Sequence, residues 1–144
     1  GFDDVLFFMW EELDLSYQLI NLGYTIRYSP EVIVRHKLSP HMRSKWRGKR
    51  YYYFVRHRLY VDFKYNRSWG RWWRYALGYF IKSSRHRAWL WAWGGIRDSR
   101  MLIQAMDKTI TPLTPSAKAY IRRYEDEVRG NFFQRIRYEV FRRL

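Results

Sequence analysis

Cysteine is absent from this 144-residue sequence, and so is any apolar run long enough to cross a membrane. Without cysteine there is no disulfide framework and no thiolate metal site, which excludes zinc fingers and agrees with a reducing compartment. The best apolar stretch, "AWLWAWGGI", has nine residues between Arg87 and Arg97, whereas a spanning helix needs about 20. This stretch is suited to lie in a membrane interface rather than to cross the bilayer.

Acidic residues are scarce over most of the chain and concentrated at its start. Residues 1–34 contain six acids and one base, and residues 35–144 contain seven acids and 27 bases, so the two parts carry −5 and +20. This asymmetry predicts a polar or cationic substrate at the first part and an anionic partner, phospholipid or nucleic acid, at the second. Aromatic residues make up 21% of the chain and eight are Trp, which favours lipid.

The first third of the chain has a mixed pattern. Apolar residues recur at helical spacing over residues 10–22, and Gly23 follows as a C-cap, so we expect a helix there. Residues 24–30 alternate, and residues 31–36 are rich in β-branched side chains, which predicts two short strands separated by a turn.

The remainder has the pattern of basic helices. Residues 43–65 predict an amphipathic helix, and two further helices should follow with a break around Ser83 and Ser84. Thr114 as N-cap and Pro115 at the first helical position predict another helix. A last helix is expected over residues 133–144.

Three acids, Glu11, Glu12 and Asp14, open the first predicted helix. One interpretation is structural, because carboxylates in a first turn interact favourably with the positive end of the helix. The alternative is chemical: the aromatic residues before them would bury the carboxylates in part, and burial raises a carboxyl pKa and makes a candidate base. His36, at the end of the second predicted strand, is likewise either structural or part of a site.

The order of these features resembles the C-terminal part of the catalytic domain in family-2 glycosyltransferases of the GT-A fold, especially bacterial rhamnosyltransferase-like enzymes. In "GFDDVLFFMWEELDLSYQLINLGYTIRYSPEVIVRHKLSP" a Gly-Phe-Asp segment leads through aromatics to an acidic pair, Asp-Leu, a helix ending in Gly-Tyr and a strand ending in His. The following "RYYYFVRHRLYV" resembles the family's Tyr-Tyr-Arg-Asn-Arg segment, with His57 where Asn is common.

The resemblance implies an α/β fold. Residues 1–42 would be the acceptor-side end of a GT-A nucleotide-sugar transferase domain, a helix plus short strands, and residues 43–144 a mainly α-helical basic extension. Within that frame Glu12 would deprotonate the acceptor hydroxyl, with Glu11 and Asp14 as supporting residues. An inverting transfer needs a carboxylate in this role.

The resemblance also implies a metal ion and two substrates. His36 would help to hold Mg²⁺ or Mn²⁺ on the diphosphate of a nucleotide-sugar donor, and the acceptor would be a glycan, often lipid-linked. The half that binds the nucleotide would lie upstream of Gly1. We therefore expect the chain to be a fragment that is inactive by itself.

The basic part predicts a peripheral site on the cytoplasmic, inner face of the cell membrane, because Lys and Arg interleaved with Trp and Tyr supply charge attraction and interfacial insertion. The expected surface residues, for membrane or acceptor, are Trp46, Arg50, Tyr52, Arg56 and Arg58. A non-enzymatic helical membrane-surface module is the main alternative. Nucleic acid is not an expected partner, since no RNP, KH or helix-turn-helix signature is present.

Overall fold

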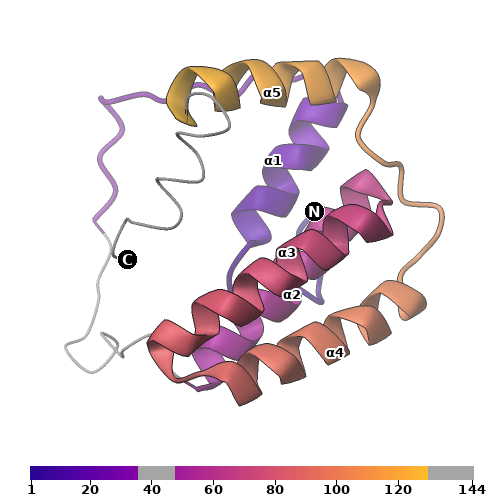
Figure 1. Cartoon of the computed structure of the whole chain (residues 1–144). Coiled ribbons are helices and arrows are strands. Elements are labelled where there is room, and N and C mark those ends of the chain that lie inside the picture. Colours follow the sequence, from indigo (N-terminus) through magenta and orange to yellow (C-terminus); the bar gives the residue numbers. More distant parts are fainter. Residues whose placement is uncertain (36–47, 130–144) are drawn as a thin grey trace.

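The computed structural model describes residues 1–35 and 48–129, and within them the regular structure is helical (Figure 1). The helices are α1 (Glu11–Asn21), α2 (Lys49–Asn66), α3 (Trp69–Ser83), α4 (Trp89–Ala105) and α5 (Pro115–Arg129), with a 3₁₀ turn, η2 (Ser84–His86), after α3. Helices α3 and α4 pack on α2 and on each other, while α5 crosses α1 at the other end of the molecule.

The predicted α/β fold is wrong for this part of the chain, because neither predicted strand forms. Residues 24–35 run without regular structure, and their apolar side chains lie in solvent: Ile33 and Val34 are each 82% exposed. An extended segment becomes a strand when a neighbour accepts and donates its backbone hydrogen bonds, and no described segment pairs with this one. The β-branched pattern predicts an extended backbone, but a sheet needs partners that local sequence does not supply.

Helix α1 confirms the first helix prediction and its end. Gly23 has a positive φ of 88°. Its N–H donates to the Ile20 carbonyl at 3.0 Å, and the Tyr24 N–H donates to the Leu19 carbonyl at 3.0 Å. These two bonds form a Schellman motif, in which a residue without Cβ adopts the left-handed conformation at lowest cost.

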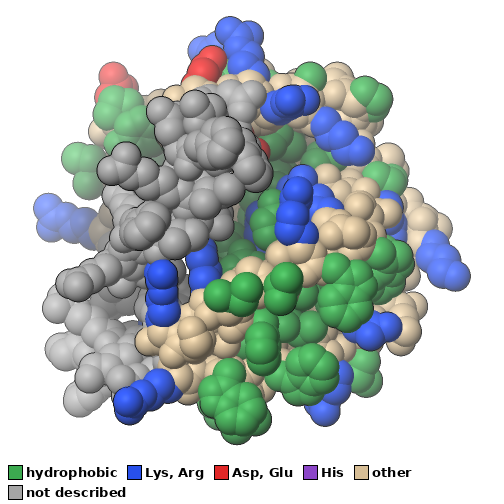
Figure 2. All heavy atoms as spheres, in the orientation of Figure 1, with side chains coloured by type: hydrophobic (Ala, Val, Ile, Leu, Met, Phe, Trp, Pro, Cys, Tyr) green, Lys and Arg blue, Asp and Glu red, His purple; other side chains and the backbone are tan. Residues whose placement is uncertain are grey.

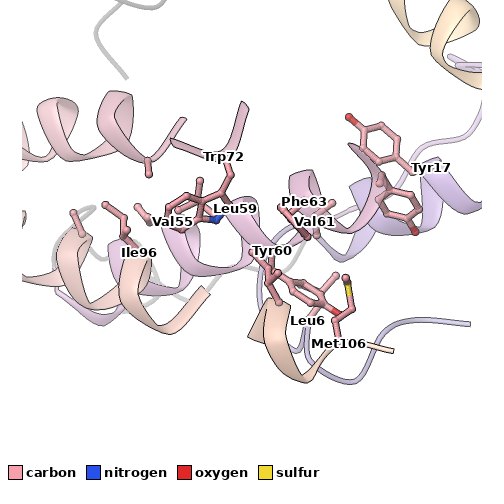
Figure 3. Packing of buried hydrophobic residues seen from close by; sticks show 14 of the residues in the cluster. Leu6, Tyr17, Val55, Leu59, Tyr60, Val61, Phe63, Trp72, Ile96 and Met106 are labelled. Carbon is pink, nitrogen blue, oxygen red and sulfur yellow. The ribbon is translucent and has the colours of Figure 1, made fainter. Parts of the chain in front are cut away.

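Helix α2 is the centre of the structure rather than a surface helix with one buried side. Val55 and Leu59 are fully buried, and they pack with Trp72 of α3 and Ile96 of α4 (Figure 3). Further along, Tyr60 lies beside Leu6 and Met106 in the same cluster. Because neighbours cover α2 on several sides, both its apolar and several of its charged residues are removed from solvent.

The remaining helix boundaries follow local signals that the sequence contains. Helix α3 ends at Ser83 as predicted. The side chain of Thr114 accepts a hydrogen bond from the Ala117 N–H at 3.2 Å, which confirms it as the N-cap of α5. The helix predicted over residues 133–144 lies outside the described residues.

Gly95 marks a close approach of α4 to α2. A Cβ at this position would lie 2.7 Å from the Tyr52 carbonyl oxygen and 3.2 Å from the Arg56 backbone nitrogen. We expect Gly95→Ala to lower the free energy of unfolding by about 1–3 kcal/mol in a denaturant titration, because the two helices must separate. The matched control is Gly78→Ala on α3, where a Cβ meets open space; it should raise stability by about 0.5–1 kcal/mol. Equal stability of the Gly95 variant and the unmodified chain would contradict the close packing.

Candidate functional site

The start of α1 is fixed by a backbone conformation that non-glycine residues rarely adopt. Met9 and Trp10 have φ values of 64° and 70°, in the left-handed region that disfavours residues with a Cβ. The Trp10 indole N–H donates to the Phe54 carbonyl at 2.9 Å, and the guanidinium of Arg58 lies 4.9 Å from the Trp10 ring centroid. These contacts with α2 hold the strained turn, which in turn sets where the acids on the next residues point.

The first turn of α1 places the three predicted acids in three different environments. Glu12 is exposed, Glu11 is half-buried, and Asp14 is completely buried. One carboxylate oxygen of Glu11, Oε2, is buried and accepts no hydrogen bond within the described residues. All three stand in the first turn, near the positive end of the helix. Glu12 is the most exposed of the three.

Asp14 is bound on every side by residues of its own fold. Its Oδ1 accepts hydrogen bonds from Lys64 Nζ at 2.6 Å and from the Tyr65 hydroxyl at 2.9 Å, and its Oδ2 accepts one from Gln18 at 2.6 Å. A carboxylate with these partners has little capacity left for a substrate. Its arrangement is that of a structural anchor between α1 and α2.

Asp3, in the N-terminal segment, is the third member of a buried ionic group. We use this name for Asp3, Asp14 and Lys64. Its Oδ2 accepts hydrogen bonds from Lys64 Nζ at 2.8 Å and from the Tyr60 hydroxyl at 3.0 Å, and its Oδ1 accepts one from the Val5 N–H. Burial opposes ionisation of Asp3, but these hydrogen bonds and the charge of Lys64 hold its pKa below the ordinary value. Sequence reasoning missed both Asp3 and Lys64. A lysine within an otherwise aromatic stretch of α2 was the available signal.

His57 is a third residue whose role was missed. It is completely buried, its Nδ1–H donates to the Phe8 carbonyl at 2.7 Å, and its ring packs edge-on against Phe7. Burial lowers the pKa of His57, so the ring is neutral at pH 7. Its Nε2 is buried and has no hydrogen-bond partner within residues 1–35 and 48–129. This histidine ties α2 to the aromatic turn that precedes the acids.

The predicted metal ligand, His36, lies outside the described residues, and so does Trp46. Within the described part, no group of three or more His, Asp or Glu side chains is arranged to hold a metal ion. The Mg²⁺ or Mn²⁺ ion therefore stays a prediction.

The four other predicted surface residues lie along α2, between helices rather than on a common outer face. The Tyr52 hydroxyl donates to Asp98 of α4 at 2.6 Å; burial and this bond raise the pKa of Tyr52 to about 12. Arg56 stacks over the Tyr52 ring, and Arg58 lies against the rings of Trp10 and Tyr75. Arg50 is also half-buried. Tyr52, Arg56 and Arg58 thus take part in packing within the molecule, and their contact with a membrane or an acceptor stays a prediction.

A different apolar surface is exposed on α3 and α4. Its members are each 39% to 63% exposed. We call this surface the outer face; it consists of Trp73, Leu77, Phe80 and Ile81 of α3 and Trp89, Leu90, Trp93 and Met101 of α4. Figure 2 shows the apolar side chains gathered over these two helices. The guanidinium of Arg100 on α4 lies 5.8 Å from the ring centroid of Trp73 on α3, which joins the two halves of the face.

Basic side chains surround the outer face. Residues 69–105 contain seven Lys or Arg and one Asp, a net formal charge of +6. Arg74, Arg87 and Arg100 are exposed, and Figure 2 shows Lys and Arg around the apolar group. Large contiguous apolar patches are rare on soluble monomeric proteins, and they usually mark contact with a protein or a membrane.

Comparison with protein-family models, curated proteins and solved structures found no match to this chain. None of the helices in residues 1–35 and 48–129 combines the length and apolar character that crossing a membrane requires.

Proposed function

We propose that this chain is the membrane-docking, acceptor-side part of a family-2 glycosyltransferase that works on the inner face of the cell membrane. The observation that carries the docking proposal is the outer face of α3 and α4, with its Trp residues and surrounding arginines. Trp favours the membrane interface because its ring is apolar and its N–H is polar. Arg side chains beside the Trp residues can form ion pairs with lipid phosphates.

The charge of this surface selects the kind of membrane. The inner leaflet of the cell membrane carries anionic lipids, and each Lys or Arg near such a surface contributes about 1 kcal/mol, screened over about 10 Å at 0.1 M salt. The apolar part of binding does not depend on salt. Docking should therefore weaken with added salt. A residual affinity should remain, because the aromatic rings inserted in the membrane do not depend on charge.

Vesicle co-sedimentation of the full chain tests this proposal. Trp73→Gln combined with Trp93→Gln should weaken partitioning onto anionic vesicles by about 30-fold or more, since each half-exposed Trp contributes about 1–2 kcal/mol on insertion. The matched control is Tyr24→Gln combined with Tyr28→Gln, which removes two exposed aromatics outside the outer face. The control should bind like the unmodified chain.

Three outcomes would overturn the docking proposal. They are equal binding to neutral and anionic vesicles, equal losses in the two double variants, and no binding to either vesicle. Tighter binding to single-stranded RNA than to vesicles would instead favour the nucleic-acid alternative, because Trp and Arg also form stacking surfaces.

The catalytic part of the proposal is supported by a separate observation at α1. Glu12 is exposed on the first turn, directly after the strained turn at Met9 and Trp10, while Asp14 is committed to the buried ionic group. An acceptor base must be reachable by a hydroxyl. Glu12 meets this requirement, in agreement with the role that the sequence resemblance implies for it.

A further inference from the structure

The strained turn at Met9 and Trp10 is attached to α2 by two hydrogen bonds. Both residues have left-handed φ values, which a residue with a Cβ keeps only where the surrounding structure enforces them. The Trp10 indole N–H donates to the Phe54 carbonyl at 2.9 Å, and His57 Nδ1 lies 2.7 Å from the Phe8 carbonyl oxygen. Because Phe54 and His57 are three residues apart on α2, one side of this helix supplies both bonds.

The bond to Phe8 fixes where the proton sits on the ring of His57. A carbonyl oxygen only accepts hydrogen bonds, so Nδ1 carries the hydrogen and Nε2 is bare in the neutral ring. Nε2 is buried and has no hydrogen-bond partner in the part of the chain that the structure describes. A proton added to Nε2 would create a charged and unpaired N–H in a buried position, which is costly. The neutral ring is therefore the form that fits this site.

The groups around His57 do not offset that cost. Burial is the strongest influence and holds the pKa of His57 below its ordinary value of 6.5. The charge of Arg56 on α2 acts in the same direction, whereas the carboxylate of Asp3 in the N-terminal segment favours the charged ring. That carboxylate already accepts hydrogen bonds on both of its oxygens. Tyr53 of α2 packs beside the imidazole, with 5.6 Å between ring centroids.

The turn can move more easily than α2. The ring of Phe7 packs edge-on against His57, yet Phe7 is 65% exposed, and Phe8 is 36% exposed. Helix α2, in contrast, packs on α3 and α4 through the fully buried Val55 and Leu59. Displacement of the aromatic turn would let water reach a protonated ring, and it would also relax the two left-handed residues.

We propose that His57 is a pH-sensitive positioning residue. The neutral ring holds the turn at Met9 and Trp10 against α2, and protonation of the ring releases the turn together with Glu11 and Glu12, which directly follow it. The consequence for acid–base chemistry rests on the proposed function, because release would move Glu12 away from its place beside α2. The attachment of the turn itself does not depend on any activity of the chain.

Acid should release the turn, and pH values above the ordinary histidine range should not. In the released turn the ring has its ordinary pKa of about 6.5, and in the attached turn the pKa is lower. The released form therefore binds more protons once the pH falls below about 6.5, so the attached form loses stability from that pH downward. Above this pH the ring is neutral in both forms, and the attachment is independent of pH.

The indole N–H of Trp10 reports on the turn, because it is bonded to α2 only while the turn is attached. Its hydrogen exchange is measured by NMR on the full chain, as protection relative to free tryptophan at the same pH, and Trp10→Phe assigns the signal. Between about pH 7.5 and pH 5 we expect protection in the unmodified chain to fall about 3-fold or more, since a buried unpaired donor is costly. Constant protection over this range would overturn the inference.

His57→Asn separates the hydrogen bond of the ring from its titration. The amide nitrogen of Asn is as many bonds from Cα as Nδ1 of His, so it can donate to the Phe8 carbonyl, but Asn does not titrate. We expect this variant to keep the protection of Trp10 at pH 7.5 and to show no loss in acid. An acid loss equal to that of the unmodified chain would assign the effect to another group, such as Asp3, and would overturn the inference.

His57→Leu removes both the donor and the titration. Protection of Trp10 should already be about 3- to 10-fold lower at pH 7.5, the scale of one hydrogen bond, with circular dichroism to confirm folding. Full protection in folded His57→Leu would show that the ring does not hold the turn. If this variant does not fold, the comparison of His57→Asn with the unmodified chain still decides. None of these measurements needs sugar transfer or vesicles, so failure of the proposed function would leave them unchanged.

Discussion

Under the proposed function, Glu12→Gln is expected to lower the rate of sugar transfer about 100-fold or more, the usual scale for loss of a general base. Gln keeps the size and the hydrogen-bonding reach of the side chain but cannot take a proton from the acceptor hydroxyl. Affinity for the nucleotide-sugar donor should stay nearly the same, because the carboxylate acts on the acceptor. The measurement is sugar transfer from a nucleotide-sugar donor, together with donor binding by calorimetry.

The neighbouring acids provide the controls for this prediction. Glu31→Gln removes another exposed carboxylate outside the cluster and should leave turnover unchanged. Glu11→Gln should have a smaller effect than Glu12→Gln, because its Oε2 points into the protein and is not exposed to an acceptor. Near-normal turnover in Glu12→Gln would contradict the assignment of Glu12 as the acceptor base. The three acids would then be explained by their interaction with the positive end of the helix alone.

The features predicted correctly from the sequence are those that a few neighbouring residues determine. Gly23 ends α1 because the left-handed residue of a Schellman motif is cheapest without a Cβ. Thr114 and Pro115 begin α5, because the hydroxyl caps a free N–H and proline lacks one. In each case the signal and the structure it determines lie within about one helical turn.

The features predicted wrongly depend on residues far apart in the chain. The β-branched residues 31–35 indicate an extended backbone, but a strand needs a partner, and none pairs with them in the described structure. Lys64 and Arg58 of α2 are shielded from solvent by Asp3, Asp14 and Trp10, which lie about fifty to sixty residues earlier in the sequence. Charge pattern alone does not reveal such partners.

The outer face shows another limit of prediction from sequence. Helices α3 and α4 are apolar on more than one side, so a helical pattern identifies the helices but not which apolar side meets α2. Trp72 is fully buried and its neighbour Trp73 is 55% exposed. Small residues on α4 mark the packed side, since Ala92 and Gly95 are buried against α2. With that side assigned, Trp89 and Trp93 are left facing outward, where an interfacial role was predicted for their stretch.

Lys64→Met is expected to cost about 3–5 kcal/mol of unfolding free energy at pH 7, the range for removing one partner of a buried ion pair. Met preserves the length and volume of the side chain, so little of the loss comes from packing. The carboxylates of Asp3 and Asp14 would remain buried without the ammonium group that they share. The measurement is urea unfolding followed by circular dichroism, with the exposed Lys49→Met as a control that should change stability by less than about 0.5 kcal/mol.

The pH dependence separates charge from packing as the origin of this loss. In the intact protein the pKa of Asp3 lies below its ordinary value of 3.8, so its stabilisation is fully present above that pH and is lost as pH falls through the folded pKa. In Lys64→Met the buried Asp3 carboxylate would lack its cation and favour protonation, so acid relieves the variant over a pH range in which the unmodified protein keeps the stabilisation from Asp3. The stability gap should therefore narrow between pH 7 and about pH 4, in the range where unpaired buried carboxyl groups titrate. A gap that stays constant over this range would mean that Lys64 stabilises the fold through its methylene chain and not through its charge.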